Sequence, residues 1–267
     1  MASWNLRAKI YPTKNGIINI DMQEATYVDA AIISGISKSF NNTLVVDNIS
    51  FNLSPGEILG LIGPNGAGKT TTFNMIVGLL KPKNGDIVLD DKAITDLPMY
   101  QRARMGIAFL CQEPSVFRKL KVIENLIAIF EIVGVKGNAA EEAAAVLLKD
   151  FNLEHVRDQK AYTLSGGERR RVEIARSLIS NPKFLLLDEP FTGIDPIARA
   201  ELQEVILKLK QRGIGILISD HNVRETLEIT DRAYLIYDAR VLLSGNAQTL
   251  INDPKVRELY LGWKFKI

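Results

Sequence analysis

Nine residues from Gly63 to Thr71, Gly-Pro-Asn-Gly-Ala-Gly-Lys-Thr-Thr, have the types and spacing of a loop that binds phosphate. Gly66 and Gly68 lack a Cβ, so the backbone can curl and direct N–H groups at an anion. Lys69 supplies a positive charge for the outer phosphates, and the Thr70 hydroxyl can ligate Mg²⁺. We therefore predict that phosphate is bound by Gly63, Pro64, Asn65, Gly66, Ala67, Gly68, Lys69, Thr70 and Thr71.

The flanking residues strengthen this interpretation. Ile58–Ile62 is a short apolar run typical of a buried strand, and Thr71–Leu80 has the pattern of a helix. A helix that starts at the loop adds its unsatisfied N–H groups and the positive end of its dipole. Taken alone, the motif could still be a glycine-rich turn without a ligand.

Two carboxylates follow a second apolar run, Phe184–Leu187. Ligands of parallel sheets gather at the carboxyl ends of the strands. Asp188 is then placed to hold Mg²⁺, and Glu189 to act as general base on an attacking water. The alternative is a pair of ordinary surface acids at a strand end.

A second candidate phosphate site begins a later helix. Ser165 and Glu168 stand three residues apart, as in a capping box, and enclose Gly166 and Gly167. The predicted helix covers Arg169–Ser180. We expect its first three residues, all arginines, to form a solvated or inter-subunit face in preference to a nucleic-acid site.

Three further side chains come at the ends of predicted strands or turns. His221 follows Ile214–Ser219 and could hydrogen-bond a transferring phosphoryl group, whereas His155 is interpreted as structural. Gln112 follows another predicted strand and could contact Mg²⁺ or the attacking water. Phe40 could stack on adenine or belong to the core.

The order of elements favours an α/β fold. Apolar runs of strand length alternate with helical segments, which predicts a parallel sheet covered on both faces. Ile32–Ile36 and Leu44–Val46 predict an antiparallel pair that turns at Asn41-Asn42, and Ile49–Leu53 a further strand. Val122–Val156 is helical in pattern, and residues 1–30 are expected to be an extension of unknown role.

Composition restricts the classes of function. The chain has 267 residues, and 33 Lys and Arg nearly cancel 31 Asp and Glu, so nucleic acid is not expected as a partner. The single cysteine excludes an internal disulfide and fits a reducing compartment. Because no apolar run reaches the roughly 18 to 20 residues that span a bilayer, we expect a cytoplasmic protein without a membrane span.

Taken together in this order, the motifs resemble those of nucleotide-binding subunits of ABC transporters over residues 31–267. The resemblance implies a P-loop NTPase core with a parallel sheet, an antiparallel β subdomain and a helical insertion subdomain at about 113–165. It also implies an ATPase that works as a homodimer, in which each ATP lies between the phosphate loop of one chain and Leu164–Glu168 of the other. Lys69, Gln112, Glu189 and His221 would be catalytic. Asp195 would lie at the dimer seam.

Three segments resemble more narrowly the ATPase subunits of lipopolysaccharide-export transporters: Cys111–Arg118, Ser165–Arg176 and His221–Leu227. This implies a protein on the cytoplasmic face of the inner membrane that powers lipopolysaccharide extraction and its export to the outer membrane. Two transmembrane subunits would dock near Phe117 and Arg118, although Phe117 could instead be a core aromatic. Alternatives are another ABC system, such as a branched-chain amino-acid or phospholipid transporter, a soluble ABC ATPase, and a module that does not hydrolyse ATP.

Overall fold

The computed structural model describes residues 11–12, 18–19, 30–263 and 265. Most of the expected N-terminal extension, residues 1–30, lies outside these ranges. Within it, β1 (Tyr11–Pro12) and β2 (Ile18–Asn19) form an antiparallel pair.

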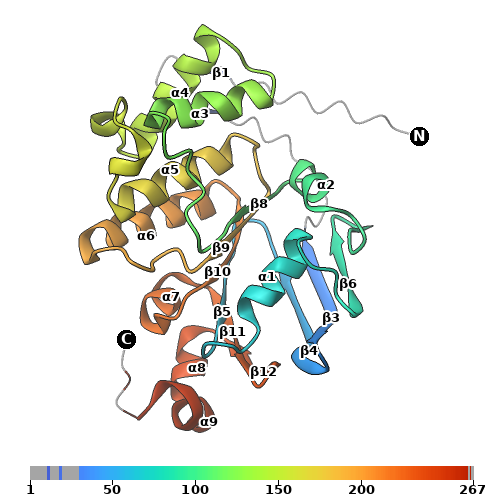
Figure 1. The fold of residues 1–267 in the computed structure, drawn as a ribbon. Coiled ribbons are helices and arrows are strands. Elements are labelled where there is room, and N and C mark those ends of the chain that lie inside the picture. The colour runs from blue at the N-terminus through green and yellow to red at the C-terminus, as the bar shows by residue number, and fades with distance from the viewer. Residues whose placement is uncertain (1–10, 13–17, 20–29, 264, 266–267) are drawn as a thin grey trace.

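A six-stranded sheet runs through the centre of the molecule in the order β12-β11-β5-β10-β9-β8 (Figure 1). The neighbouring pairs are parallel except β11 with β12. Every residue of β5, β9 and β10 is buried, so the predicted fully buried parallel strands are confirmed. The strand bounds are β5 (Ile58–Ile62), β8 (Ile107–Leu110), β9 (Phe184–Asp188), β10 (Gly215–Ser219), β11 (Arg232–Tyr237) and β12 (Arg240–Gly245).

Apolar cores lie on both faces of this sheet. Alternate residues of β9 face opposite sides: Leu185 and Leu187 join one cluster, and Phe184 and Leu186 the other. The first cluster is covered by the helices α3 to α6, and the second by α1 and the smaller sheet. The helices with their bounds are α1 (Lys69–Val77), α2 (Met99–Arg104), α3 (Val122–Ile132), α4 (Asn138–Asp150), α5 (Gly166–Leu178), α6 (Pro196–Gln211) and α7 (Val223–Ile229).

The smaller sheet is antiparallel, in the order β4-β3-β6-β7. Asn41 and Asn42 both have positive φ, 46° and 65°, and form the predicted turn between β3 and β4. The prediction of two separate strands between residues 44 and 53 was wrong, because Asn48, at φ 52°, bulges one continuous strand without ending it. The bounds are β3 (Ala31–Phe40), β4 (Thr43–Leu53), β6 (Asn84–Leu89) and β7 (Lys92–Ala93).

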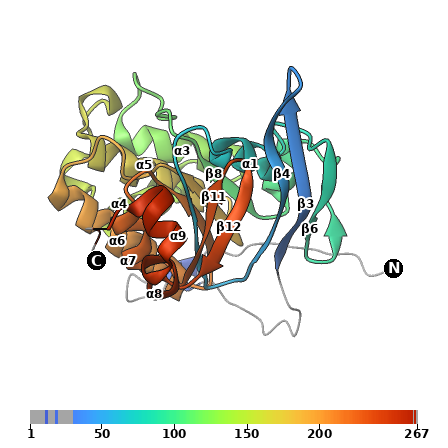
Figure 2. The same cartoon turned by 90° about the horizontal axis from the view of Figure 1, so that it is seen from below.

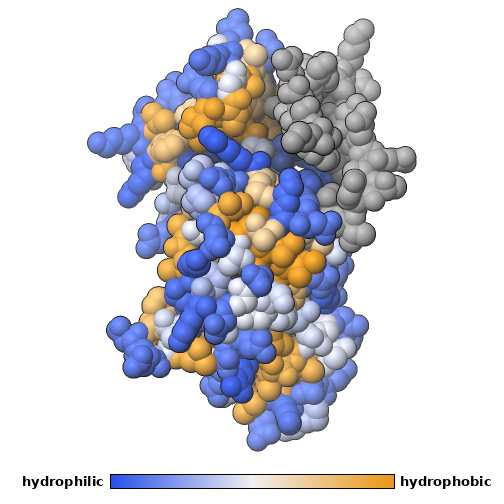
Figure 3. Space-filling view, turned by 90° about the vertical axis from the view of Figure 1, so that its right-hand side faces the viewer, coloured by the Kyte–Doolittle hydropathy of each residue, from blue (hydrophilic) through white to orange (hydrophobic). Residues whose placement is uncertain are grey.

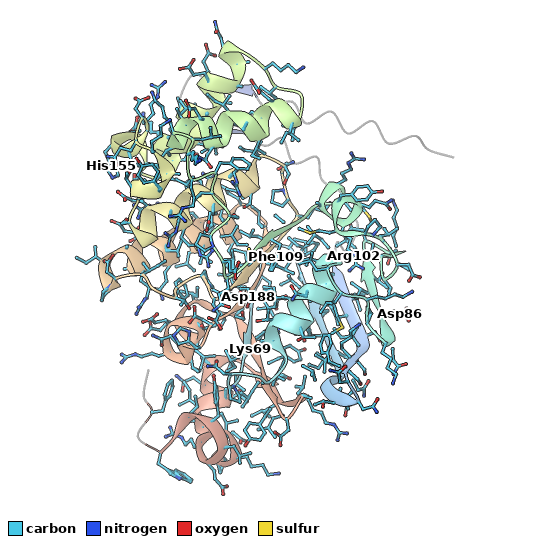
Figure 4. The ribbon with its side chains drawn as sticks, in the orientation of Figure 1. Lys69, Asp86, Arg102, Phe109, His155 and Asp188 are labelled. Atoms are coloured by element: carbon cyan, nitrogen blue, oxygen red, sulfur yellow. The ribbon has the colours of Figure 1, made fainter. Side chains whose placement is uncertain are left out.

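The helices α3 and α4 project from one end of the central sheet (Figure 1). Two short 3₁₀ turns, η1 (Glu154–Val156) and η2 (Ala161–Thr163), lead from them to α5. His155 lies in this helical region, away from Lys69 and Asp188 (Figure 4).

The C-terminal segment, residues 247–263, packs beside β11 and β12 (Figure 2). It consists of α8 (Ala247–Asn252), α9 (Pro254–Val256) and a π-helical turn, η3 (Arg257–Leu261). In the parts of the chain that the structure describes, none of the helices has the length and apolarity that crossing a membrane requires. On the face seen in Figure 3, hydrophobic residues form separate patches among hydrophilic ones.

Candidate active site

The predicted phosphate loop joins β5 to α1 and borders a cavity of about 500 Å³. Helix α1 begins directly after Gly68, which has φ +105° and no side chain to cap the helix. A Cβ at Gly68 would lie 2.5 Å from Val45 O, so glycine is required here on two counts. The cavity is lined by Val45, Asn65, Gly66, Gly68, Lys69, Thr70, Thr71, Gln112, Glu189 and His221.

Lys69 is held inside the loop. Its Nζ donates hydrogen bonds to Gly63 O at 2.7 Å and to Pro64 O at 3.0 Å. Burial lowers the pKa of Lys69, while the nearby carboxylates of Glu189 and Asp188 oppose this shift. The ammonium therefore lies near two carboxylates and donates to the backbone of its own loop, and Figure 4 shows Lys69 close to Asp188.

Asp188 ends β9 and is almost completely buried. Its Oδ1 accepts a 2.5 Å hydrogen bond from Ser219 Oγ, and the Thr70 hydroxyl also hydrogen-bonds its carboxylate. Burial raises the pKa of Asp188, and these two hydrogen bonds oppose the rise. A hydroxyl and a carboxylate side by side are oxygen ligands of the kind that Mg²⁺ prefers, so the donor set fits this ion.

Glu189 follows Asp188 in a left-handed conformation, with φ 50°. Its N–H donates to Ser219 O at 2.9 Å, which fixes this turn to the end of β10. Its Oε2 accepts hydrogen bonds from Gln112 Nε2 at 2.9 Å and from Thr192 Oγ1 at 3.2 Å. The carboxylate is thus held at the wall of the cavity, and positive φ at a residue with a side chain is typical of functional sites.

His221 lies at the same wall. Its Nδ1 is 3.2 Å from Asp220 Oδ1, 3.3 Å from Thr192 Oγ1 and 3.8 Å from Glu189 Oε2. Asp220 is fully buried and also accepts backbone N–H groups of Phe191 and Asn222. Sequence reasoning missed Thr192 and Asp220, although both adjoin motifs that it had identified.

The second candidate phosphate site forms the expected capping box. The backbone N–H of Ser165 donates to Glu168 Oε2 at 2.9 Å, and that of Glu168 donates to Ser165 Oγ at 3.3 Å. A Cβ at Gly166 would lie 2.9 Å from Gly193 O, so this helix start packs closely against the turn before Asp195. Asp195 Oδ1 accepts the N–H groups of residues 197 and 198 and caps α6.

Several predicted residues do not line the cavity that contains Lys69. Gly63, Pro64 and Ala67 belong to the loop but are not among the lining residues, and neither is buried Asp188. Phe40 is 44% exposed, so its interpretation as a core residue was wrong. Outside the cavity also lie the residues of the second motif and the α6 cap: Ser165, Gly166, Gly167, Glu168 and Asp195.

An arginine network behind the site was not foreseen. Arg170 and Arg171 are buried, so the predicted solvated face was wrong for these two residues. Arg170 Nη1 donates to Cys111 O at 2.9 Å and to Glu173 Oε2 at 2.9 Å, and Arg171 pairs with Glu201. Each arginine has acceptors that allow its burial, and apart from Glu173 these come from distant parts of the sequence.

The second Nη of Arg170 continues the network. It donates to Gln112 O at 3.2 Å and to Glu189 O at 3.4 Å. One guanidinium therefore joins the start of α5 to the backbone of both residues that meet at the Glu189 carboxylate.

The protein family follows from similarity to known families. The ABC transporter family model matches residues 46–192, which include the phosphate loop, the capping box and both carboxylates. The chain belongs to the ABC transporter family. It is an ATP-binding subunit of that family and an ATPase.

Two relatives carry the same printed name, lipopolysaccharide export system ATP-binding protein LptB. That of Acidithiobacillus ferridurans is 52% identical and covers 86% of this chain and 95% of its own. The protein of that name from Escherichia coli K12 is 46% identical, and the match covers 87% of this chain and 97% of the relative.

Solved ABC structures share the fold. An ATP-binding cassette in its ADP conformation has a TM-score of 0.78 at 30% identity and covers 88% of this chain and 99% of its own. A dimeric cassette in a post-hydrolysis state, bound to ADP and Pi, has a TM-score of 0.72 at 25% identity and covers 81% and 98%. The α/β ABC ATPase fold expected from the sequence is confirmed.

Proposed function

We propose that this chain is the ATP-hydrolysing subunit of a lipopolysaccharide-export transporter, at the cytoplasmic face of the inner membrane. The observation that carries the proposal is the 52% and 46% identity, over almost their full length, to two proteins with that printed name. Residues 31–267 would form one ABC ATPase domain with a helical subdomain at about 113–165. Residues 1–30 would be an extension without an assigned role.

ATP would bind with its phosphates in the loop from Gly63 to Thr71. Uncapped N–H groups at the start of α1 and the Lys69 ammonium would hold the phosphate oxygens. Thr70, Asp188 and Gln112 supply oxygen atoms suited to Mg²⁺, which neutralises phosphate charge when bound. Phe40 is exposed, as stacking on adenine requires.

Glu189 would take the proton from the attacking water. Gln112 and Thr192 both donate to its Oε2, which orients the carboxylate toward the cavity. His221, oriented by Asp220, would donate a hydrogen bond to the phosphoryl oxygens. Both groups lie at the carboxyl ends of neighbouring strands, β9 and β10.

The functional unit would be a homodimer. Ser165, Gly166, Gly167 and Glu168 lie outside the Lys69 cavity of their own chain. They would complete the ATP site of the partner chain, with Asp195 near the seam. The dimeric cassette with 25% identity supports dimerisation.

The two transmembrane subunits would dock at Phe117 and Arg118. Phe117 is 44% exposed, and the guanidinium of Arg176 lies 4.9 Å from its ring centroid. Fully buried Asn125 fixes the Phe117 backbone, since its Oδ1 accepts the N–H at 2.7 Å and its Nδ2 donates to the C=O at 3.2 Å. An exposed aromatic on a rigid backbone is suited to anchor a partner.

A continuous set of contacts leads from this surface to the catalytic wall. Arg176 Nη2 donates to Ser115 Oγ at 2.8 Å, and the Ser115 N–H donates to Glu173 Oε1 at 2.5 Å. Glu173 pairs with Arg170, which reaches Glu189 O. Movement of a docked partner would therefore bear on the position of Glu189.

The test is affinity purification of the full chain from detergent-solubilised membranes, with mass spectrometry of the proteins that co-elute. We expect the two membrane subunits of a lipopolysaccharide exporter. Phe117→Ala should reduce their recovery, whereas Ile132→Ala, a control at a 76% exposed apolar residue at the end of α3, should not. Co-elution of a permease with a different specificity would overturn the proposed substrate. Absence of this chain from the membrane fraction would favour a soluble ABC ATPase.

A further inference from the structure

The C-terminal segment is fixed in place by polar contacts. Asp253 Oδ1 accepts the N–H of Val256 at 2.9 Å and caps the turn after α8. Arg257 Nε donates to Ile251 O at 2.6 Å, and its Nη1 donates to Trp263 O at 3.0 Å. These bonds set the direction in which the π-helical turn η3 presents its side chains.

An apolar cluster joins this segment to the active-site strands. It contains Ile62, the last residue before the phosphate loop, and Val223 and Leu227 of the helix that follows His221. Buried Val256 belongs to the same cluster, and Tyr260 packs against it. The C-terminal segment therefore shares one core with the strand before the phosphate loop and with the helix after His221.

Tyr260 also reaches the phosphate loop itself. Its hydroxyl oxygen accepts a 3.2 Å hydrogen bond from the N–H of Gly63, although 197 positions separate the two residues. The carbonyl of Gly63 accepts the 2.7 Å bond from Lys69 Nζ. Gly63 is thus held between Tyr260 and the lysine that faces the phosphates.

Gly63 also lies close to the backbone of a neighbouring strand. A Cβ at this position would lie 2.2 Å from Ile236 O, so the backbone of β11 presses on the loop from the other side. Burial raises the pKa of Tyr260 to about 12, with the Gly63 hydrogen bond acting against the rise. The hydroxyl therefore keeps its proton at neutral pH.

We propose that Tyr260 is a positioning residue for ATP binding, which holds the backbone of Gly63 and, through it, Lys69 in the orientation that receives phosphate. The C-terminal segment is then part of the ATP site although it touches no nucleotide. The inference rests on ATP binding in the loop from Gly63 to Thr71, and it is independent of the molecule exported.

The size of the effect follows from a population argument. A loop that visits other conformations binds ATP with an affinity reduced by the fraction that is competent. One net hydrogen bond changes such a fraction by about 2- to 10-fold. Removing the hydroxyl should therefore weaken ATP binding by about that factor and leave the chemical step unchanged.

The test is Tyr260→Phe in the full chain, with Tyr234→Phe as the matched control. Tyr234 lies on β11, and its hydroxyl accepts a hydrogen bond from Arg232 Nη1 at 3.1 Å, a residue outside the phosphate loop. We expect Tyr260→Phe to raise both Kd and KM for ATP by about 2- to 10-fold. Its kcat should change less than twofold, and its urea midpoint should match the control.

The outcomes separate the alternatives. A Kd for ATP that shifts equally in both variants, or in neither, would overturn the proposal. A fall in kcat at unchanged Kd would also overturn it, because positioning for binding would then be wrong. Loss of ATP binding by the unmodified chain would instead refute the ATPase assignment.

A second measurement tests the reverse effect, that of ATP binding on the C-terminal segment. In Glu189→Gln chains with Mg²⁺ and ATP, hydrogen–deuterium exchange at residues 254–263 should slow on ATP addition. Adding Tyr260→Phe should abolish this protection, because the bond that transmits it is gone. Equal protection with and without the Tyr260 hydroxyl would contradict the proposal.

Discussion

Gln112 Nε2 donates a 2.9 Å hydrogen bond to Glu189 Oε2, and so joins the end of β8 to the catalytic wall at the end of β9. The Thr192 hydroxyl donates to the same oxygen at 3.2 Å. Two donors on one oxygen select a single orientation of the carboxylate. The side chain proposed to take a proton from water is therefore oriented before any nucleotide enters.

Glu189→Gln is expected to bind ATP normally but to turn over about 10²- to 10⁴-fold more slowly, because the amide cannot accept the proton. Without hydrolysis, the ATP-bound dimer should persist and elute earlier in size-exclusion chromatography with Mg²⁺ and ATP. Single-turnover kinetics would measure the rate. Hydrolysis at the wild-type rate would exclude Glu189 as the base.

Lys69→Ala is expected to weaken ATP binding by about 10- to 100-fold, since a hydrogen bond to a charged group is removed from the phosphates. Equilibrium titration with a fluorescent ATP analogue would measure the change. Lys92→Ala, an exposed lysine on β7, is the control and should bind as the wild type does. Equal affinity of the two variants would contradict the role of Lys69.

Asp188→Asn is expected to weaken Mg²⁺ binding by at least about 10- to 100-fold. Mutation of a residue that only hydrogen-bonds a metal ligand already costs about this much. The nucleotide-free protein should become more stable at pH 7. Burial raises the pKa of Asp188 in the fold, so its ionised form opposes folding, and stability falls as pH rises through the folded-state pKa.

Urea denaturation between pH 4 and 8 would test this prediction. The variant should lose the part of the pH dependence that the ionisation of Asp188 causes. Asp158→Asn, which replaces an exposed carboxylate, is the control and should not raise the stability at pH 7. A variant no more stable than the wild type at pH 7 would show that burial does not dominate at Asp188.

The sequence predicted well the elements that are buried on all sides. Ile58–Ile62 and Phe184–Leu187 are continuous apolar runs, and such runs form strands only where both faces of a sheet are covered. The sequence also predicts which residues stand at the ends of these strands, because they come next in the chain. It does not predict the positive φ of Glu189 or the single strand through Asn48, because contacts with distant segments stabilise both.

The burial of Arg170 is another feature that the local sequence does not predict. Three consecutive arginines at a helix start favour solvent by composition. Burial of Arg170 depends on Glu173 of the same helix and on the distant carbonyls of Cys111, Gln112 and Glu189. Likewise, Tyr260 and Gly63 are 197 positions apart in the sequence, so no local pattern predicts their contact.

Arg170→Ala is expected to lower the free energy of unfolding by about 3–5 kcal/mol, because it leaves Glu173 buried without its partner. The double variant Arg170→Met/Glu173→Met should recover most of that loss, since the unpaired charge is gone as well. Chemical denaturation of both variants would measure this difference. Arg169→Ala should stay within about 0.5 kcal/mol of wild type, as surface changes do. If the double variant is as unstable as the single one, the backbone contacts of Arg170 matter more than its pairing with Glu173.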